Sequence, residues 1–191
     1  MSEEGQKALL VVISAPSGGG KTTLANELLR RFPNSQKSIS VTTRPSRSTE
    51  IPGQDYKFIS DEQFEEYLQD NAFAEWAKVH GHRYGTLKKN IQEALDHNKT
   101  LFLTIDFQGA ENIKKSFPDC LTFFVQPPDF DVLESRLRKR GTENEEEIRR
   151  RLENARKEMS LADTFDYRVL NDRLDRVALE IESIIKKQSH S

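Results

Sequence analysis

The chain has 191 residues, and its 29 Lys and Arg against 31 Asp and Glu give a formal net charge of −2. The length fits one domain, or one core with two small insertions, and the charge argues against a globally basic nucleic-acid binder. Cys120 is the only cysteine, which excludes an intramolecular disulfide and disfavours a cysteine-based metal site. No apolar stretch approaches the roughly 20 residues of a membrane span, and the first residues lack a signal-peptide pattern. We therefore expect a soluble, cytoplasmic protein.

Short apolar runs alternate with longer amphipathic segments along the chain. Five runs predict strands, at 8–14, 37–43, 101–107, 121–126 and 167–171. Helical patterns cover 22–32, 86–98, 109–117, 131–140, 145–159 and 174–188. Buried strands that alternate with helices favour a parallel sheet covered on both faces. Two segments break this rhythm, about 38–85 and the highly charged 134–158, and we interpret both as excursions from the edge of the sheet.

A glycine-rich loop joins the first predicted strand to the first helix. It comprises Ala15, Pro16, Ser17, Gly18, Gly19, Gly20, Lys21 and Thr22. Strand, loop and helix in this order form the context of a P-loop, in which backbone N–H groups wrap a phosphate at a helix N-terminus. Lysine would then neutralise phosphate oxygens and threonine would bind Mg²⁺. Ala15 stands where the pattern usually begins with glycine, and the alternative is an ordinary glycine-rich turn.

Other polar residues suggest partners for this loop. Asp106 follows the strand predicted at 101–107 and could hold Mg²⁺ or its water, or it could simply cap the next helix. Arg44 and Arg47, three residues apart and close to Tyr56, could clamp a second phosphate. A solvated loop with scattered charge explains those arginines equally well.

Four sequence blocks give the chain a resemblance to the guanylate kinases over about residues 8–187. They are APSGGGKTT at 15–23, SVTTRPSRSTEIPGQDY at 40–56, FAEWAKVHGHRYGT at 73–86, and IDFQGA at 105–110 followed by RGTENEEEIRRRL at 140–152. The resemblance implies an enzyme of purine nucleotide metabolism that transfers the γ-phosphoryl of Mg·ATP to GMP, and to dGMP as a second substrate. It implies small-molecule substrates, no nucleic acid and no membrane partner, while monomer and homodimer both stay open.

The resemblance also implies a role for each matching residue. ATP would be bound by the P-loop residues 15–22, Thr23, Arg136 and Asn171. GMP would be bound by Ser40, Arg44, Arg47, Tyr56, Glu75, Tyr84, Gly85, Thr86 and Asp106. Catalysis would fall to Lys21, Arg44, Arg140 and Arg151, and Mg²⁺ to Thr22, with Asp106 reaching it through water. Asn171 is almost equally explained as a turn residue.

The chemistry of guanine fits the residues assigned to the base. Its N1–H and N2–H₂ groups are donors that a carboxylate such as Glu75 accepts, whereas adenine presents an unprotonated N1 there. Hydroxyls of Ser40 and Thr86 can donate to guanine O6. A buried site of this kind rejects bases that leave its polar atoms unpaired. Taken alone, Glu75 could also be a carboxylate on the surface of a helix.

These arguments predict one guanylate-kinase-like α/β domain of the P-loop NTPase type. A five-stranded parallel core with helices on both faces (1–37, 99–128 and 164–191) would carry a mixed α/β GMP-binding insertion (38–98) and a helical lid (129–163). One departure from the family is Thr104, which replaces a usual acidic residue two positions before Asp106. It bears on the metal surroundings and the rate more than on the substrate.

Two other classes of protein are alternatives to the enzyme. A guanylate-kinase-like protein-binding module typically has a degraded P-loop, whereas Lys21 and Thr22 are intact here. A kinase of similar fold that acts on a phosphorylated sugar would not need Ser40, Glu75 and Thr86 together.

Overall fold

The structure is a computed structural model that describes residues 7–16, 18–48, 50–79, 81–139 and 144–189. Its core is a five-stranded parallel sheet in the order β2-β7-β1-β8-β9. The strands are Ser35–Lys37 (β2), Thr100–Thr104 (β7), Leu10–Ser14 (β1), Leu121–Gln126 (β8) and Tyr167–Leu170 (β9). The predicted five-stranded parallel core is therefore confirmed.

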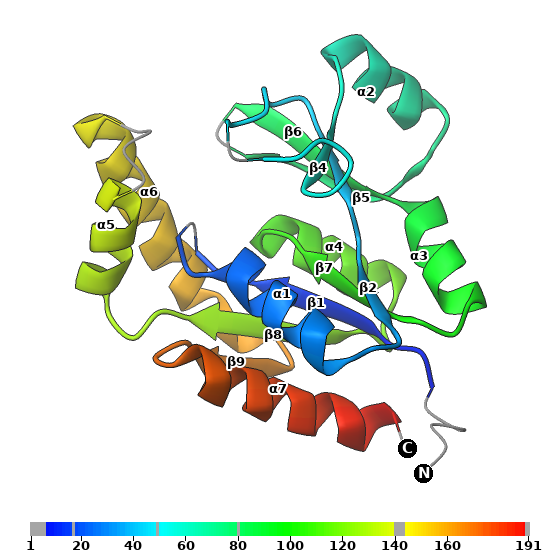
Figure 1. Cartoon of the computed structure of the whole chain (residues 1–191). Coiled ribbons are helices and arrows are strands. Elements are labelled where there is room, and N and C mark those ends of the chain that lie inside the picture. The colour runs from blue at the N-terminus through cyan, green and yellow to red at the C-terminus, as the bar shows by residue number, and fades with distance from the viewer. Residues whose placement is uncertain (1–6, 17, 49, 80, 140–143, 190–191) are drawn as a thin grey trace.

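Helices cover both faces of this core sheet (Figure 1). Helices α1 (Lys21–Arg31) and α7 (Leu174–Ser189) pack on one face, while α3 (Lys88–Asp96), α4 (Phe107–Ser116) and the 3₁₀ turn η1 (Ala162–Thr164) pack on the other. Strand β1 shows why both faces are apolar. Its Val11 and Ile13 enter the α1–α7 layer and its Leu10 and Val12 enter the α3–α4 layer, all nearly inaccessible to solvent.

A second sheet, here called the small sheet, lies above the core sheet in Figure 1. Its strand order is β4-β3-β6-β5, with β3–β4 parallel and the other pairs antiparallel. The strands are Ser40–Thr42 (β3), Tyr56–Phe58 (β4), Phe73–Val79 (β5) and His82–Leu87 (β6). Helix α2 (Asp61–Gln69) covers it and inserts Phe64 among Val41, Phe73 and Leu87.

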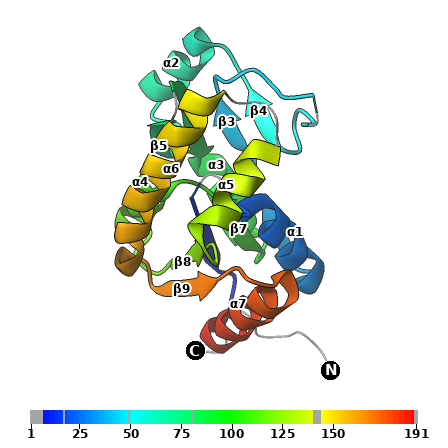
Figure 2. The same cartoon turned by 90° about the vertical axis from the view of Figure 1, so that its left-hand side faces the viewer.

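A pair of helices, α5 (Phe130–Lys139) and α6 (Glu145–Ser160), follows the carboxyl end of β8 and projects from the core. Figure 2 shows this helix pair standing in front of the core sheet and extending towards the small sheet. A capping box at Asn144 and Glu147 starts α6. Arg138 of α5 forms ion pairs with Glu134 of its own helix and with Glu145 of α6, which joins the two helices.

Several predicted boundaries were wrong. The single strand predicted at 37–43 is two strands in different sheets, because the chain leaves the core after the Ser38 N–H bonds to Phe102 O at 2.9 Å. The helix predicted from residue 86 begins at Lys88, since Thr86 and Leu87 still belong to β6. The small sheet was not predicted as a sheet. Helix α3 falls within the expected insertion 38–98, yet its Ile91 and Ala94 pack in the core.

None of the described helices is long and apolar enough to cross a membrane.

Candidate functional site

The glycine-rich loop lies between β1 and α1, as the motif predicts. Gly18 and Gly20 have positive φ values, +86° and +93°, which favour glycine at these two turns. Gly20 begins α1 without any side-chain cap, so backbone N–H groups of the first helical turn face outward. Thr22 and Thr23 are exposed on this turn, and Lys21 Nζ donates to Ala15 O at 2.5 Å. Ser17 lies outside the described residues.

Residues distant in sequence hold this loop in shape. The buried Asn171, directly after β9, donates from Nδ2 to Gly19 O at 2.9 Å. A methyl group added to Gly20 would lie 3.9 Å from Arg136 NH1, so α5 brings this guanidinium beside the loop. The sequence predictions for Asn171 and Arg136 thus fall on residues that the fold brings to the P-loop.

One face of the small sheet gathers most of the residues predicted to bind GMP. Ser40 pairs with Tyr56, Thr42 with Tyr84 and Glu75 with Thr86. Directly paired residues share a face of a sheet, and residues two apart on one strand share it as well. The polar face therefore comprises Ser40, Thr42, Tyr56, Tyr84, Thr86 and Glu75. Gly85 lies on the opposite, apolar face, where an added methyl group would lie 2.5 Å from the Phe73 ring.

Arg44 organises one end of the polar face. Its Nε donates to Tyr84 OH at 3.2 Å, and its guanidinium carbon lies 5.5 Å from the centre of the Tyr56 ring. Glu50 joins it to Arg47, because Glu50 Oε1 accepts from Arg44 NH2 at 2.7 Å and Oε2 accepts from the Arg47 N–H at 2.8 Å. These bonds hold the pKa of the Glu50 carboxyl below its usual value although burial opposes them. Sequence reasoning assigned no role to Glu50.

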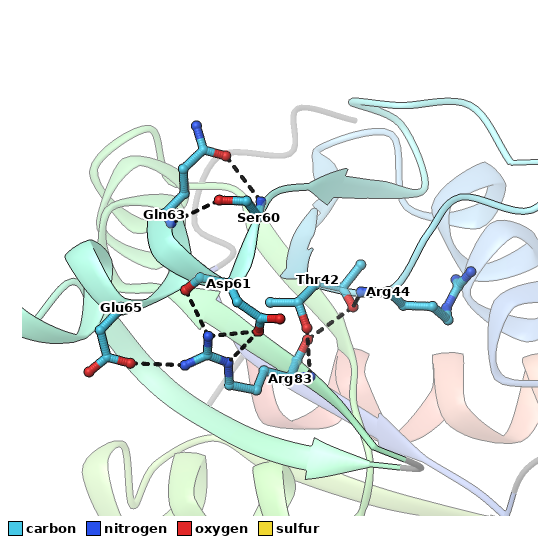
Figure 3. A network of polar contacts seen from close by, with 8 residues as sticks. Thr42, Arg44, Ser60, Asp61, Gln63, Glu65 and Arg83 are labelled. Carbon is cyan, nitrogen blue, oxygen red and sulfur yellow. Dashed lines mark hydrogen bonds and ion pairs between the residues drawn. The ribbon is translucent and has the colours of Figure 1, made fainter.

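Arg83 of β6 joins the same end of the small sheet to helix α2, as Figure 3 shows. Its guanidinium donates to Asp61 Oδ1 through Nε at 3.1 Å and NH2 at 2.7 Å, and it also contacts Glu65 at 3.0 Å. Its carbonyl accepts from Thr42 Oγ1 at 3.0 Å, and the same hydroxyl accepts from the Arg44 N–H at 3.2 Å. A continuous chain of hydrogen bonds therefore links α2 to the backbone of Arg44.

Glu75 lies at the other end of the polar face. It is buried and belongs to strand β5, so the alternative that it is a carboxylate on the surface of a helix is wrong. Thr86 Oγ1 donates to Glu75 Oε1 at 2.6 Å. Burial raises the pKa of Glu75 to about 7, the nearby Asp106 charge adds to the rise, and the Thr86 hydrogen bond opposes it. A buried carboxyl with a pKa raised towards neutrality is typical of a functional position.

Asp106 caps α4 by accepting from the Gly109 N–H at 2.8 Å with Oδ1. Asp106 therefore caps the next helix, which is one of the two roles predicted for it from the sequence. The hydrogen bond from Gly109 uses Oδ1 and not Oδ2. Thr104 ends β7, two residues before Asp106, and is half-buried.

Glu158 of α6 is a carboxylate at this site that sequence reasoning missed. Burial raises its pKa, the Lys21 charge lowers it and the Asp106 charge raises it, so Glu158 lies within electrostatic reach of both. The sequence predicted a solvated helix face for Glu145, Glu146 and Arg149 in the same helix, and no sequence pattern distinguishes Glu158, which the structure shows half-buried. Arg151 lies on the same helix and is half-buried. Arg140 lies outside the described residues.

The described part of the chain holds no group of three or more His, Cys, Asp or Glu placed to ligate a metal. The exposed hydroxyl of Thr22 and the carboxylate of Asp106 nevertheless supply oxygen ligands of the kind that Mg²⁺ takes, and this ion keeps several waters and takes its other ligands from a nucleotide.

Comparisons with known proteins agree with this geometry. A family model described as guanylate kinase matches residues 7–188. The guanylate kinase of Syntrophotalea carbinolica is 46% identical over 180 residues, which cover 94% of this chain and 86% of that protein. The guanylate kinase of Thermotoga maritima is 42% identical over 182 residues, which cover 95% and 88%. The crystal structure of guanylate kinase from Anaplasma phagocytophilum superposes with a TM-score of 0.80 at 30% identity, covering 97% of this chain and 88% of that one. The chain belongs to the guanylate kinase family.

Proposed function

We propose that this protein transfers the γ-phosphoryl group of ATP to GMP, and to dGMP, giving ADP and GDP. The observation that carries the proposal is the polar face of the small sheet. It holds an arginine–tyrosine group suited to a phosphate at one end and a buried carboxylate–hydroxyl pair suited to guanine at the other. Membership of the guanylate kinase family supports the same reaction.

The base would be read by Glu75, Thr86, Ser40 and Asp106. Guanine N1–H and N2–H₂ would donate to the Glu75 carboxylate, which Thr86 already orients through Oε1. The buried Ser40 hydroxyl would complete the set on the neighbouring strand. Adenine would leave the carboxylate facing an unprotonated nitrogen, and unpaired buried groups of this kind are costly.

The GMP phosphate would be bound by Arg44, Arg47, Tyr56 and Tyr84. Arginine forks match phosphate oxygens, and a tyrosine hydroxyl adds a further donor. Glu50 would keep Arg44 and Arg47 extended towards the site before the substrate arrives.

ATP would be bound by the P-loop and the residues that brace it. Backbone N–H groups at the start of α1 would hold the β-phosphate, and Lys21 would move from Ala15 O to the phosphate oxygens. Asn171 and Arg136 would line the nucleotide side of the loop. Thr22 would hold Mg²⁺, with Asp106 reaching it through water, and the metal would neutralise charge on the transferred group.

The domain roles follow from these positions. Residues 38–98 would form the GMP-binding insertion, 129–163 the lid and the remainder the core. Closure of the lid would bring Arg140 and Arg151 to the transferred phosphoryl group and would exclude water, which otherwise competes as acceptor. No general base is needed, because a phosphate monoester oxygen of GMP is already ionised near pH 7. The buried free thiol of Cys120 fits a cytoplasmic location.

The test is ADP formation with Mg·ATP and GMP, AMP, UMP or no acceptor, measured in parallel. We expect turnover with GMP only. Folded protein that binds GMP but forms no ADP with any of these acceptors would contradict the proposal and would favour a binding module instead.

A further inference from the structure

The strand that carries Glu75 contains an irregularity that decides where this side chain lies. The register of β5 against β6 shifts between Phe73 and Glu75. The centre of the Phe64 ring lies 4.5 Å from that of Phe73 and 6.1 Å from that of Trp76, so both side chains lie on the same face of β5. In a regular strand, Phe73 and Trp76 would lie on opposite faces, because they are three residues apart. The bulge absorbs this change, as bulges commonly do when they redirect a side chain. Ala74 and Glu75 consequently both point towards the core and α4.

Glu75 then meets α4 at a glycine in the first helical turn. A methyl group with ideal geometry at Gly109 would lie 2.7 Å from Glu75 Oε2, 3.2 Å from its Cδ and 3.3 Å from Asp106 Oδ1. A Cβ atom essentially never approaches another atom as closely as 2.7 Å, so Glu75 Oε2 occupies space that a glycine leaves open. Gly109 is buried and its φ is not positive, so backbone conformation does not require glycine there. Glycine is also among the weakest helix formers.

We propose that Gly109 is a specificity-determining positioning residue for the guanine-reading carboxylate. The inference rests on the proposed function, since it assigns to Glu75 the recognition of guanine. Thr86 fixes Oε1 from β6 while the bare surface of Gly109 receives Oε2 from α4, so both carboxylate oxygens have a defined place. The atom that must yield to a side chain at Gly109 is the end of a flexible carboxylate, and the fold therefore tolerates the substitution while the site changes.

The experiment measures GMP and IMP affinities by calorimetry, with steady-state kinetics alongside, for the wild type and Gly109→Ala. IMP keeps the N1–H of guanine but lacks the 2-amino group, so the ratio of the two affinities reports how well the carboxylate is placed. We expect Gly109→Ala to weaken GMP binding by about tenfold or more and to reduce the preference for GMP over IMP. The KM for ATP and the helical circular dichroism should stay unchanged.

Two further variants separate positioning from general damage. Asn112→Ala introduces alanine one turn further along α4 and should leave both affinities unchanged. In a Glu75→Ala background, adding Gly109→Ala should cost no more affinity, because the carboxylate that it displaces is gone.

Three results would overturn the inference. The first is a Gly109→Ala protein that binds GMP and IMP as tightly as the wild type does. The second is an equal loss of affinity for GMP and for IMP in Gly109→Ala. The third is a loss of GMP affinity on adding Gly109→Ala that is the same in the wild-type and the Glu75→Ala background. A wild type that binds GMP selectively but transfers no phosphoryl group would defeat the proposed function and leave this inference testable by binding.

Discussion

Replacing Glu75 by Gln should stabilise the folded protein above neutral pH while it weakens recognition of guanine. The folded state raises the pKa of this carboxyl to about 7 from an ordinary value of 4.5, because burial penalises its ionised form. A raised carboxyl pKa means that the folded state holds the proton more tightly than the unfolded chain does. Stability from this group is therefore fully present below about pH 4.5 and is lost as the pH rises through about 7.

The size of the effect follows from the shift. The difference between the two pKa values corresponds to about 3 kcal/mol of unfolding free energy at pH 8. For a chain of this length that is roughly 6–12 °C in melting temperature. Glutamine keeps an oxygen to accept from Thr86 and carries no charge, so it should recover most of this energy.

Thermal and urea denaturation of the wild type and Glu75→Gln, from pH 5 to pH 8.5, would measure this difference. The variant should gain stability over the wild type progressively as the pH rises, and the two should converge near pH 5. Glu66→Gln, on an exposed position of α2, is the matched control and should show no such trend. A Glu75→Gln protein that is no more stable than the wild type at pH 8.5 would refute the reasoning.

Four further predictions follow from the site. The affinity of the wild type for GMP should fall as the pH drops below about 7, because a protonated Glu75 no longer accepts from guanine. Glu75→Gln keeps the titration of GMP itself but not that of Glu75, so the additional loss of affinity in the wild type measures the contribution of Glu75. Lys21→Met should reduce kcat by roughly a thousandfold or more with an unchanged melting temperature, and near-normal turnover would contradict the P-loop assignment. Asn171→Ala removes the partner of Gly19 O and should raise the KM for ATP by about tenfold, but not that for GMP. Arg83→Ala should raise the KM for GMP several-fold and leave that for ATP, because it frees β6 from α2; an equal rise in both would indicate general loosening.

The core was predictable from the sequence because its strands are buried on both faces. Runs such as 8–14 and 121–126 are mostly apolar on both faces, as is typical of a covered parallel strand. The glycine-rich loop was equally clear, since its position between a strand and a helix is part of the motif.

The small sheet was not predictable in the same way. Strands β3 and β4 have three residues each, and one face of the sheet carries polar residues, so hydrophobic alternation is weak. The break at Ser38, which turns one apparent strand into two, depends on a contact with β7 that no local pattern records.

Some site residues depend entirely on tertiary contacts. Glu158 looks like one of many charges on a solvated helix until the fold brings it within electrostatic reach of Lys21 and Asp106. Gly109 looks like an ordinary helix residue until the bulge in β5 brings Glu75 above it. The roles of such residues depend on their places in the folded structure, whereas a sequence pattern shows only the types of residue and their spacing.

The central claim is that this site transfers a phosphoryl group to guanine nucleotides and discriminates by the base. The most direct test is a single reaction in which γ-labelled Mg·ATP meets equal amounts of GMP, AMP and UMP, because direct competition yields the ratios of kcat/KM. We predict that the label appears in GDP. Label distributed among the three acceptors, or released as inorganic phosphate, would contradict the account.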